Sequence, residues 1–181
     1  MNVISIILNV DQEKIYEYWL KKGKPSSIAM KPADLLKYLY MVSETGSTFT
    51  GHATSDLIIE AKPGDEVRWY ETPIQPSAAY SICIKDIITH GNWAKYVVNQ
   101  GGDFVQSRTE QTLRAYYIDK ELRANSASMD YSSAKIIEAE KIGTLPATIT
   151  YDFNLSLVEM VNGIPTLRCT LTFDPGIKIL N

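Results

Sequence analysis

The sequence is poor in the residues that most often build covalent bridges and metal sites. Its 181 residues include only two cysteines and two histidines. Two cysteines in a chain of this length do not make the disulfide framework of a small secreted protein. Strand alternation around each cysteine directs Cys169 towards a core and Cys83 away from it. We therefore expect no disulfide bond.

Catalytic signatures are also missing. The sequence has no glycine-rich phosphate loop and no nucleophile elbow, and its neighbouring acidic residues, Asp65-Glu66 and Glu138 with Glu140, are typical of turns and solvated surfaces. We expect no catalytic residues, no cofactor and no enzymatic activity. An enzyme without a recognisable motif stays open as a third hypothesis, because catalytic groups can come from distant positions in a chain.

The charge balance argues against two classes of partner. Lys and Arg number 18 against 21 for Asp and Glu, without the basic stripe that phosphate binding requires, so we expect no nucleic-acid partner. No apolar run is long enough to span a bilayer. The apolar patch near the N-terminus has no basic residue before it and no cleavage site after it, so it is expected to be a core strand and not a signal peptide. We therefore expect a cytoplasmic location. The length suits one domain, residues 1–181.

Residues 55–74 carry the clearest local structural signal. Leu57, Ile59 and Ala61 alternate with more polar positions, as in a strand with one buried side. Pro63-Gly64 then suits the central positions of a tight turn, and Val67 and Trp69 share a face of a second strand. The stretch predicts either a hairpin or an arch that joins two sheets.

The N-terminal third predicts a buried strand and a short helix. Val3–Val10 is rich in β-branched residues, Asp11 is placed to cap a helix that extends to about Leu20, and Gly23 is placed to end it. Pro32–Val42 stays open between helix and strand, with strand slightly favoured. Ala134–Lys141 is equally open between a short helix and an edge strand.

The C-terminal third predicts a β-hairpin. Apolar residues alternate with polar ones on both sides of Asn162-Gly163, a pair preferred in two-residue hairpin turns. Asn99–Ser107 and Asn125–Ser133 are expected to be loops. With roughly seven or eight strands and one or two short helices, the sequence predicts an all-β fold, an antiparallel two-sheet β-sandwich with a cupredoxin-like or immunoglobulin-like layout.

A metal site is not expected in this sandwich. The sequence of the segment Ala61–Val67 is similar to that of the corresponding cupredoxin strand, and His52, His90 and Cys83 are residues of the types that bind copper. No methionine follows Cys83 and His90 until Met129, and the C-terminal region has no histidine. We therefore predict no metal, with both histidines at the surface or in local hydrogen bonds.

The segment that follows the strand Tyr80–Ile88 is the candidate ligand site. His90, Asn92, Trp93 and Tyr96 bring an imidazole, an amide, an indole and a phenol into one loop. Such groups suit carbohydrate binding, with the aromatic rings for stacking. The alternative is that Trp93 folds back and covers one end of the sandwich.

Several segments together resemble a known family. They are the apolar opening strand followed by Asp11 and a short helix with Ile15, and the segments Thr54–Leu57, Pro63–Trp69, Tyr80–Ile82 and Thr172–Pro175. This order resembles the bacterial inclusion-body family typified by PixA and AidA. The resemblance implies an abundant intracellular protein of host-associated bacteria, crystalline inclusions in some members and population-density control in others, and no agreed catalytic residues.

Two functional hypotheses follow. The first is a non-enzymatic, self-associating homo-oligomer, a dimer or larger, that accumulates in the cell in inclusions and acts in host association. It is based on the resemblance and on the small net charge of −3, which gives little repulsion between copies. The second is a module that binds carbohydrate or another small ligand at His90–Tyr96.

Overall fold

The computed structural model describes residues 2–29, 32–43, 48–74, 79–98, 106–118, 120–137 and 145–180, and all counts of elements refer to these. In the N-terminal half the elements are β1 (Val3–Val10), α1 (Gln12–Lys21), β2 (Ser27–Ala29), α2 (Pro32–Leu35), β3 (Leu39–Ser43), β4 (Thr48–Thr50), β5 (Ile58–Ala61), β6 (Glu66–Pro73) and β7 (Tyr80–Thr89). The remaining elements are α3 (Trp93–Tyr96), β8 (Val97–Val98), β9 (Gln106–Ile118), β10 (Glu121–Ile136), β11 (Ala147–Val161), β12 (Ile164–Phe173) and β13 (Gly176–Ile179).

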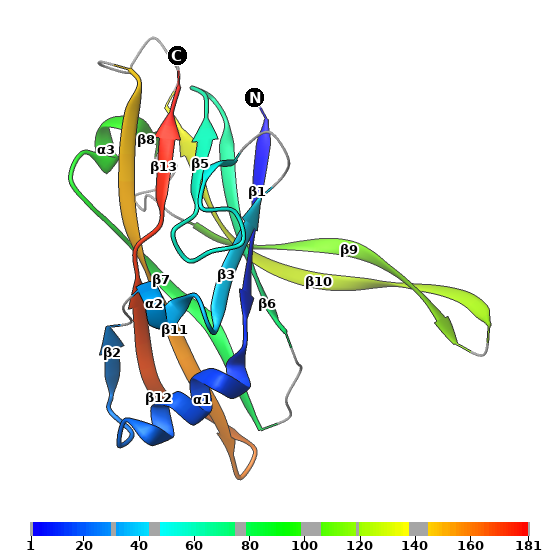
Figure 1. Ribbon diagram of the computed structural model, residues 1–181. Coiled ribbons are helices and arrows are strands. Elements are labelled where there is room, and N and C mark those ends of the chain that lie inside the picture. Colours follow the sequence, from blue (N-terminus) through cyan, green and yellow to red (C-terminus); the bar gives the residue numbers. More distant parts are fainter. Residues whose placement is uncertain are drawn as a thin grey trace.

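The strands form two sheets that pack as a sandwich (Figure 1). The first sheet has six strands in the order β3-β1-β6-β10-β8, with β9 paired to β10. The second has seven strands in the order β2-β12-β11-β13-β5-β4, with β7 paired to β11. The all-β sandwich predicted from the sequence is confirmed.

Both sheets are mixed rather than purely antiparallel. The pairs β1–β6, β12–β2 and β13–β5 are parallel, and the other pairs are antiparallel. Parallel neighbours need long connections, and alternation within single strands carries no information about the direction of a neighbour. The sequence therefore predicted the layers without predicting these three pairings.

The core lies between the sheets and includes aromatic residues from both. Trp69 of β6 packs edge-on against Tyr151 and Phe153 of β11, with ring centroids 5.4 Å and 6.2 Å apart. Its Nε1 donates a hydrogen bond of 2.9 Å to the Tyr151 hydroxyl in the fully buried interior. The predicted core position of Trp69 is confirmed, and the bond satisfies a polar group that would otherwise be buried without a partner.

Residues 58–73 form an arch, not a hairpin. β5 belongs to the second sheet and β6 to the first, so the turn between them crosses from one layer to the other. Gly64 has a φ of 89°, as expected for the third position of the turn. The carboxylate of Asp65 accepts backbone N–H groups of Asn2 and Lys62 at 2.8 Å and 3.0 Å, which ties the arch to the start of β1.

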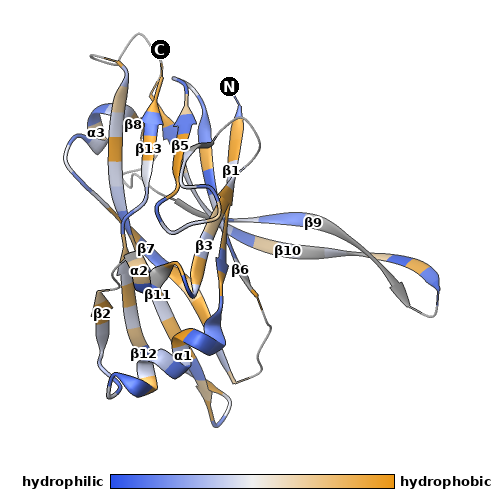
Figure 2. Ribbon diagram, viewed as in Figure 1, coloured by the Kyte–Doolittle hydropathy of each residue, from blue (hydrophilic) through white to orange (hydrophobic). Residues whose placement is uncertain are grey.

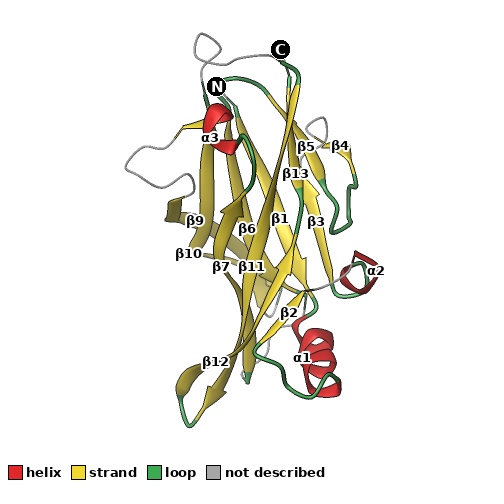
Figure 3. Ribbon diagram, turned by 90° about the vertical axis from the view of Figure 1, so that its left-hand side faces the viewer, coloured by secondary structure: helices red, strands yellow, loops and turns green. Residues whose placement is uncertain are grey.

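Helix α1 has the predicted caps. The Asp11 carboxylate accepts a hydrogen bond from the Lys14 backbone N–H at 3.0 Å, and Gly23, with a φ of 80°, follows the end of the helix. Figure 3 shows α1 at the lower end of the sandwich and α3 at the upper end. None of the described helices is long and apolar enough to cross a membrane.

The predicted C-terminal hairpin is confirmed. β11 and β12 pair in antiparallel register up to Val161 and Ile164, and Asn162 and Gly163 between them have φ values of 52° and 78°. Both angles are positive, as a type I′ turn requires. Figure 2 shows polar and apolar residues alternating along β11.

Several local predictions need correction. The loop expected at Asn125–Ser133 is wrong, because these residues belong to β10. Pro32–Val42 divides into helix α2 and strand β3, and Ala134–Ile136 of the open segment Ala134–Lys141 ends β10, while residues 138–141 lie outside the described residues. Of the loop predicted at Asn99–Ser107, the last two residues begin β9 and residues 99–105 are not described.

The two cysteines are free and differ in burial as predicted. Cys169 is buried in the core, and Cys83 on the edge strand β7 is half-buried. Burial raises the pKa of both thiols, and for Cys83 the nearby Glu71 carboxylate adds to the effect. Both thiols therefore resist ionisation, which lowers their reactivity.

Candidate functional site

The most prominent surface feature is a two-stranded ribbon that projects from the first sheet. β9 and β10 pair over thirteen positions, from Gln106 opposite Ser133 to Ile118 opposite Glu121. Only Tyr131–Lys135 of β10 pair with β6 as well. We call β9 and Glu121–Asp130 of β10 the arm, and Figure 1 shows its green and yellow strands extending away from the sandwich.

The arm has two faces that continue the two faces of the first sheet. Tyr131 lies on the outer face beside Arg68 and Tyr70, while Asp130 and Ser132 lie on the inner face with Trp69. Because alternate residues of a strand share a face, the inner face of the arm continues outwards through Ser128, Ser126, Ala124 and Leu122. In the sandwich that face is covered by the second sheet. In the arm, Leu122 is 65% exposed.

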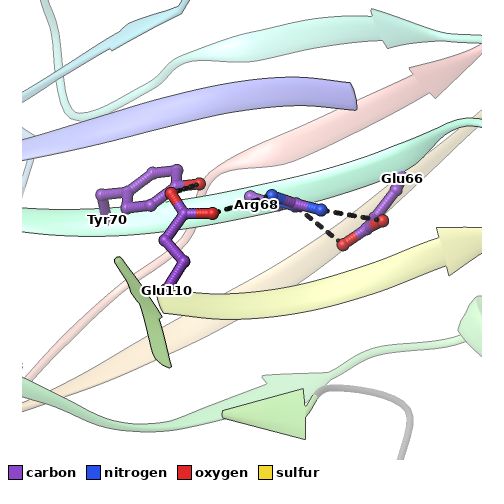
Figure 4. Close-up of polar contacts among 4 residues, drawn as sticks. All are labelled: Glu66, Arg68, Tyr70 and Glu110. Carbon is purple, nitrogen blue, oxygen red and sulfur yellow. Dashed lines mark hydrogen bonds and ion pairs between the residues drawn. The ribbon is translucent and has the colours of Figure 1, made fainter. Parts of the chain in front are cut away.

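On the outer face, a charged cluster attaches the arm to β6 (Figure 4). The Arg68 guanidinium donates to Glu66 from Nε at 2.8 Å and to Glu110 of β9 from Nη1 at 3.1 Å. The second carboxylate oxygen of Glu110 accepts the Tyr70 hydroxyl at 2.9 Å. One carboxylate of the arm is thus held by two groups of the sandwich, and we call Arg68, Tyr70 and Glu110 the clamp.

Aromatic packing and electrostatics support the clamp. The guanidinium of Arg68 lies 4.8 Å from the centroid of the Tyr131 ring, a cation–π arrangement, and the rings of Tyr70 and Tyr131 are 5.3 Å apart. The hydrogen bond to Glu66 is the main cause that raises the pKa of Arg68, against the opposing effect of burial. Burial raises the pKa of the Tyr70 hydroxyl, so the phenol stays protonated and donates to Glu110.

On the inner face, the root of the arm borders a small pocket between the two sheets. The pocket has a volume of about 70 Å³ and is lined by Trp69, Glu71, Ile84, Asp130, Tyr131 and Ser132. The Glu71 carboxylate reaches across from β6 and accepts the backbone N–H of Ile84 on β7. It therefore satisfies a donor on the open edge of the second sheet, which edge strands otherwise offer to other chains.

The size and the side chains of the pocket limit what it could bind. Burial raises the pKa of the Glu71 carboxyl, the hydrogen bond from Ile84 opposes this, and Asp130 adds a smaller increase. The volume suits a few water molecules. In the described part of the chain, no three His, Cys, Asp or Glu side chains are grouped so that they could bind a metal ion.

The structure brings the predicted ligand residues together only in part. Asn92 precedes α3 and is exposed, and His90 is exposed with its Nε2 at 2.9 Å from Oδ1 of Asp152. Trp93 is 1% exposed and packs edge-on against Tyr151 with ring centroids 5.4 Å apart, and Tyr96 packs partly buried against the core. The indole covers one end of the sandwich, which was the alternative interpretation of its role, and offers no open face for stacking.

The Trp93 N–H has no hydrogen-bond partner among the described residues. A buried indole N–H normally finds an acceptor.

Sequence patterns missed the arm because its residues are small and polar. Ser126, Ser128, Ser132 and Ser133 suggested a loop. The available signal was the alternation of Leu122 and Ala124 with charged or amide residues, which continues through the serines. Strand pairing over this length is decided by a partner strand that local composition does not reveal.

Comparison with known proteins identifies the family. The profile described as "PixA: Inclusion body protein" matches residues 2–178. The chain belongs to the PixA inclusion-body protein family. The resemblance of the sequence to this family is therefore confirmed.

One solved structure of the PixA family has a similar fold. It is the crystal structure of an inclusion body protein from Burkholderia cenocepacia, with a TM-score of 0.67, 12% identity, and coverage of 98% of this chain and 95% of that chain. At that identity the likeness establishes the shared fold alone. A search of curated proteins finds no match.

Proposed function

We propose that this PixA-family protein is a non-enzymatic, self-associating protein that accumulates in the cytoplasm in inclusions, and that its arm is the element that joins copies. The observation that carries the proposal is the unsupported ribbon. Among the described strands, residues 121–130 of β10 pair with β9 alone. A two-stranded ribbon is marginally stable in water unless other elements pack against it, so a neighbouring molecule supplies the missing support.

The attachment of the arm supports this role. The clamp links Glu110 to Arg68 and Tyr70, and these bonds hold the arm away from the sandwich at a defined root. An element that is fixed in an extended position loses less conformational entropy when it binds than a flexible loop does. The net charge of −3 adds little repulsion between copies.

The test is inclusion formation in expressing cells. The parent chain is compared with a variant in which residues 112–127 are replaced by Asn-Gly, which closes the ribbon at the pair Gln111 and Ser128. Electron microscopy of cell sections should show inclusions with the parent and a dispersed protein with the variant. Ile164→Ser, at the exposed tip of the β11–β12 hairpin, is the matched surface control. Inclusions that persist without the arm would refute its role.

Carbohydrate binding at His90, Asn92, Trp93 and Tyr96 stays a prediction, as does a role in host association. With the indole buried, His90 and Asn92 are the exposed residues of this site, and Tyr96 is half-buried. A glycan array with the parent chain and with Asn92→Ala tests that site independently of the arm.

A further inference from the structure

The pocket on the inner face of the arm root is lined mainly by hydrogen-bond acceptors. It lies where β6, β7 and β10 meet, and its volume is about 70 Å³. Its polar side chains are the carboxylates of Glu71 and Asp130 and the hydroxyl of Ser132, while Trp69 and Ile84 form apolar parts of its wall. Ionised carboxylates only accept hydrogen bonds, so the pocket suits a ligand that donates them.

The Glu71 carboxylate is only partly satisfied within the protein. Its Oε2 accepts the backbone N–H of Ile84, and its Oε1 has no hydrogen-bond partner among the described residues. Its charged neighbour is Asp130, a second carboxylate, and this neighbour and burial both raise the pKa of Glu71. On the outer face, by contrast, the carboxylate of Glu110 is paired with Arg68. The inner pair has no corresponding cation in the described part of the chain.

Ser132 provides an independent sign of a missing ligand. It is 7% exposed, lines the pocket and lies opposite Trp69 on the inner face of the sheet. Its hydroxyl makes no hydrogen bond to any described residue, although buried polar side chains are normally paired. At the exposed mouth of the pocket, Asp130 accepts the Thr109 hydroxyl through Oδ1 at 2.6 Å, and no described residue donates to its Oδ2. Three side chains with an oxygen that lacks a donor therefore line one small space.

We propose that this pocket binds a primary ammonium group, the charged end of a small aliphatic amine or of a lysine side chain. Such a group has three N–H donors and no acceptor, which matches the oxygens of Glu71, Asp130 and Ser132. Its positive charge compensates two carboxylates that are otherwise costly to hold close together near the core. Amine binding does not require that copies of the protein associate, so the site is separate from the role of the arm.

The size and composition of the pocket restrict the ligand further. A water molecule takes up about 30 Å³ in the liquid, so the pocket has room for an ammonium group with one or two carbon atoms and excludes a large ring. The apolar parts of Trp69 and Ile84 suit the carbon atoms next to the nitrogen. Among the described residues, no three His, Cys, Asp or Glu side chains are grouped as metal ligands, which favours a hydrogen-bonded cation over a coordinated metal ion.

Amide NMR spectra test the binding. Methylammonium chloride is titrated into the ¹⁵N-labelled parent chain, with tetramethylammonium chloride added to keep the ionic strength constant. Tetramethylammonium has the same charge and no N–H donor. We expect saturable chemical-shift changes at Ile84 and Ser132 with methylammonium, and none with tetramethylammonium or sodium chloride alone.

Three substitutions locate the site. Glu71→Gln removes the buried charge and keeps an oxygen for the Ile84 N–H, and it should weaken methylammonium binding by about tenfold or more. Ser132→Ala should weaken binding by about threefold to tenfold. Asp86→Asn is the matched control, because the Asp86 carboxylate lies on the same edge strand as Ile84 and bonds to Asn154 on the outer face. It removes the same charge and should leave the affinity unchanged. Circular dichroism verifies that the variants fold.

The pH dependence of binding has a defined sign. Glu71 pairs with an ammonium group when it is ionised, and the titratable groups beside it are Asp130 on β10 and the Cys83 thiol on β7. Methylammonium keeps its charge in the carboxyl range, as a lysine does. Its affinity should therefore increase as the pH rises through the raised pKa of Glu71, and this increase should be smaller in Glu71→Gln.

Two larger probes separate the possible sources of the amine. The probe 1,4-diaminobutane carries the ammonium group on a free small molecule, and acetyl-lysine methylamide, with its side-chain amine free, carries it on a lysine side chain. Tighter binding of the first identifies a small amine as the ligand, tighter binding of the second identifies a protein side chain, and either result supports the site. The proposal is overturned if none of these amines gives saturable shifts, if tetramethylammonium or sodium gives the same shifts, or if the parent and Glu71→Gln bind methylammonium equally.

Discussion

Replacing Glu110 by Gln should loosen the root of the arm while the sandwich stays intact. In the parent, the Glu110 carboxylate lies 3.1 Å from Nη1 of Arg68 and 2.9 Å from the Tyr70 hydroxyl. Glutamine keeps the shape of the side chain and has no charge. It has one oxygen acceptor, so it cannot accept hydrogen bonds from both groups through separate oxygens.

The size of the effect follows from the exposure of the pair. The Arg68 and Glu110 side chains are 23% and 33% exposed, between the exposed ion pairs that contribute about 0.2–1 kcal/mol and the buried charge-assisted bonds that contribute about 1.5–3 kcal/mol. We expect Glu110→Gln to lower the free energy of opening of the arm root by about 1 kcal/mol, which corresponds to an opening equilibrium about five times larger.

Amide hydrogen exchange measures this opening residue by residue. Protection should fall at the root, near Thr109 and Tyr131, and stay unchanged in the core strand β11. Tyr70→Phe removes one hydroxyl from the same cluster, and the double variant should show a coupling of at least about 0.5 kcal/mol. Equal loss of protection in β11 and at the root, or no loss at either, would refute the role of the clamp.

Three further changes test other parts of the structure. Tyr151→Phe leaves the Trp69 N–H without its buried acceptor and should lower the free energy of unfolding by about 1–3 kcal/mol in urea titrations. Burial raises the pKa of Glu71, so the folded parent loses stability as the pH rises from the ordinary carboxyl range through the raised pKa. Over that pH range Glu71→Gln should be more stable than the parent. At lower pH the two proteins should have more similar stability. Gly51→Ala should destabilise the protein, because Gly51 has a φ of 73° and an added Cβ would collide with the Asp56 carbonyl; a thermal melt equal to that of the parent would contradict this account.

Local patterns predicted the parts of the fold that local interactions decide. The caps of α1 at Asp11 and Gly23 depend on residues within one turn of the chain, and the Asn162-Gly163 turn depends on two backbone angles. The burial of Trp69 followed from its position in a two-residue alternation. Each of these features required only neighbours in sequence.

Local sequence patterns did not predict the features that depend on distant residues. Local sequence does not distinguish an arch at Pro63-Gly64 from a hairpin, because the choice depends on which sheet each strand joins. The parallel pairing of β1 with β6 joins segments far apart in the chain. The Ser-rich part of β10 has the composition of a loop, and its strand conformation is set by pairing with β9.

The candidate site shows the same difference between features set by sequence neighbours and features set by distant residues. An aromatic-rich segment after a strand drew attention to Trp93, but the ring is buried against Tyr151, a residue that the segment itself does not contain. The clamp joins β6 to β9 across β10, with Arg68 and Glu110 separated by 42 residues. No local motif marks such a cluster.

The mass of the protein in solution tests the role of the arm most directly. Size-exclusion chromatography with light scattering is run over a concentration series on the parent chain and on the variant with residues 112–127 replaced by Asn-Gly. The parent should rise above the 20.3 kDa of one chain as its concentration increases, and the shortened variant should stay monomeric throughout. Equal association of the two proteins, or a parent that remains monomeric, would contradict the proposal that the arm joins copies.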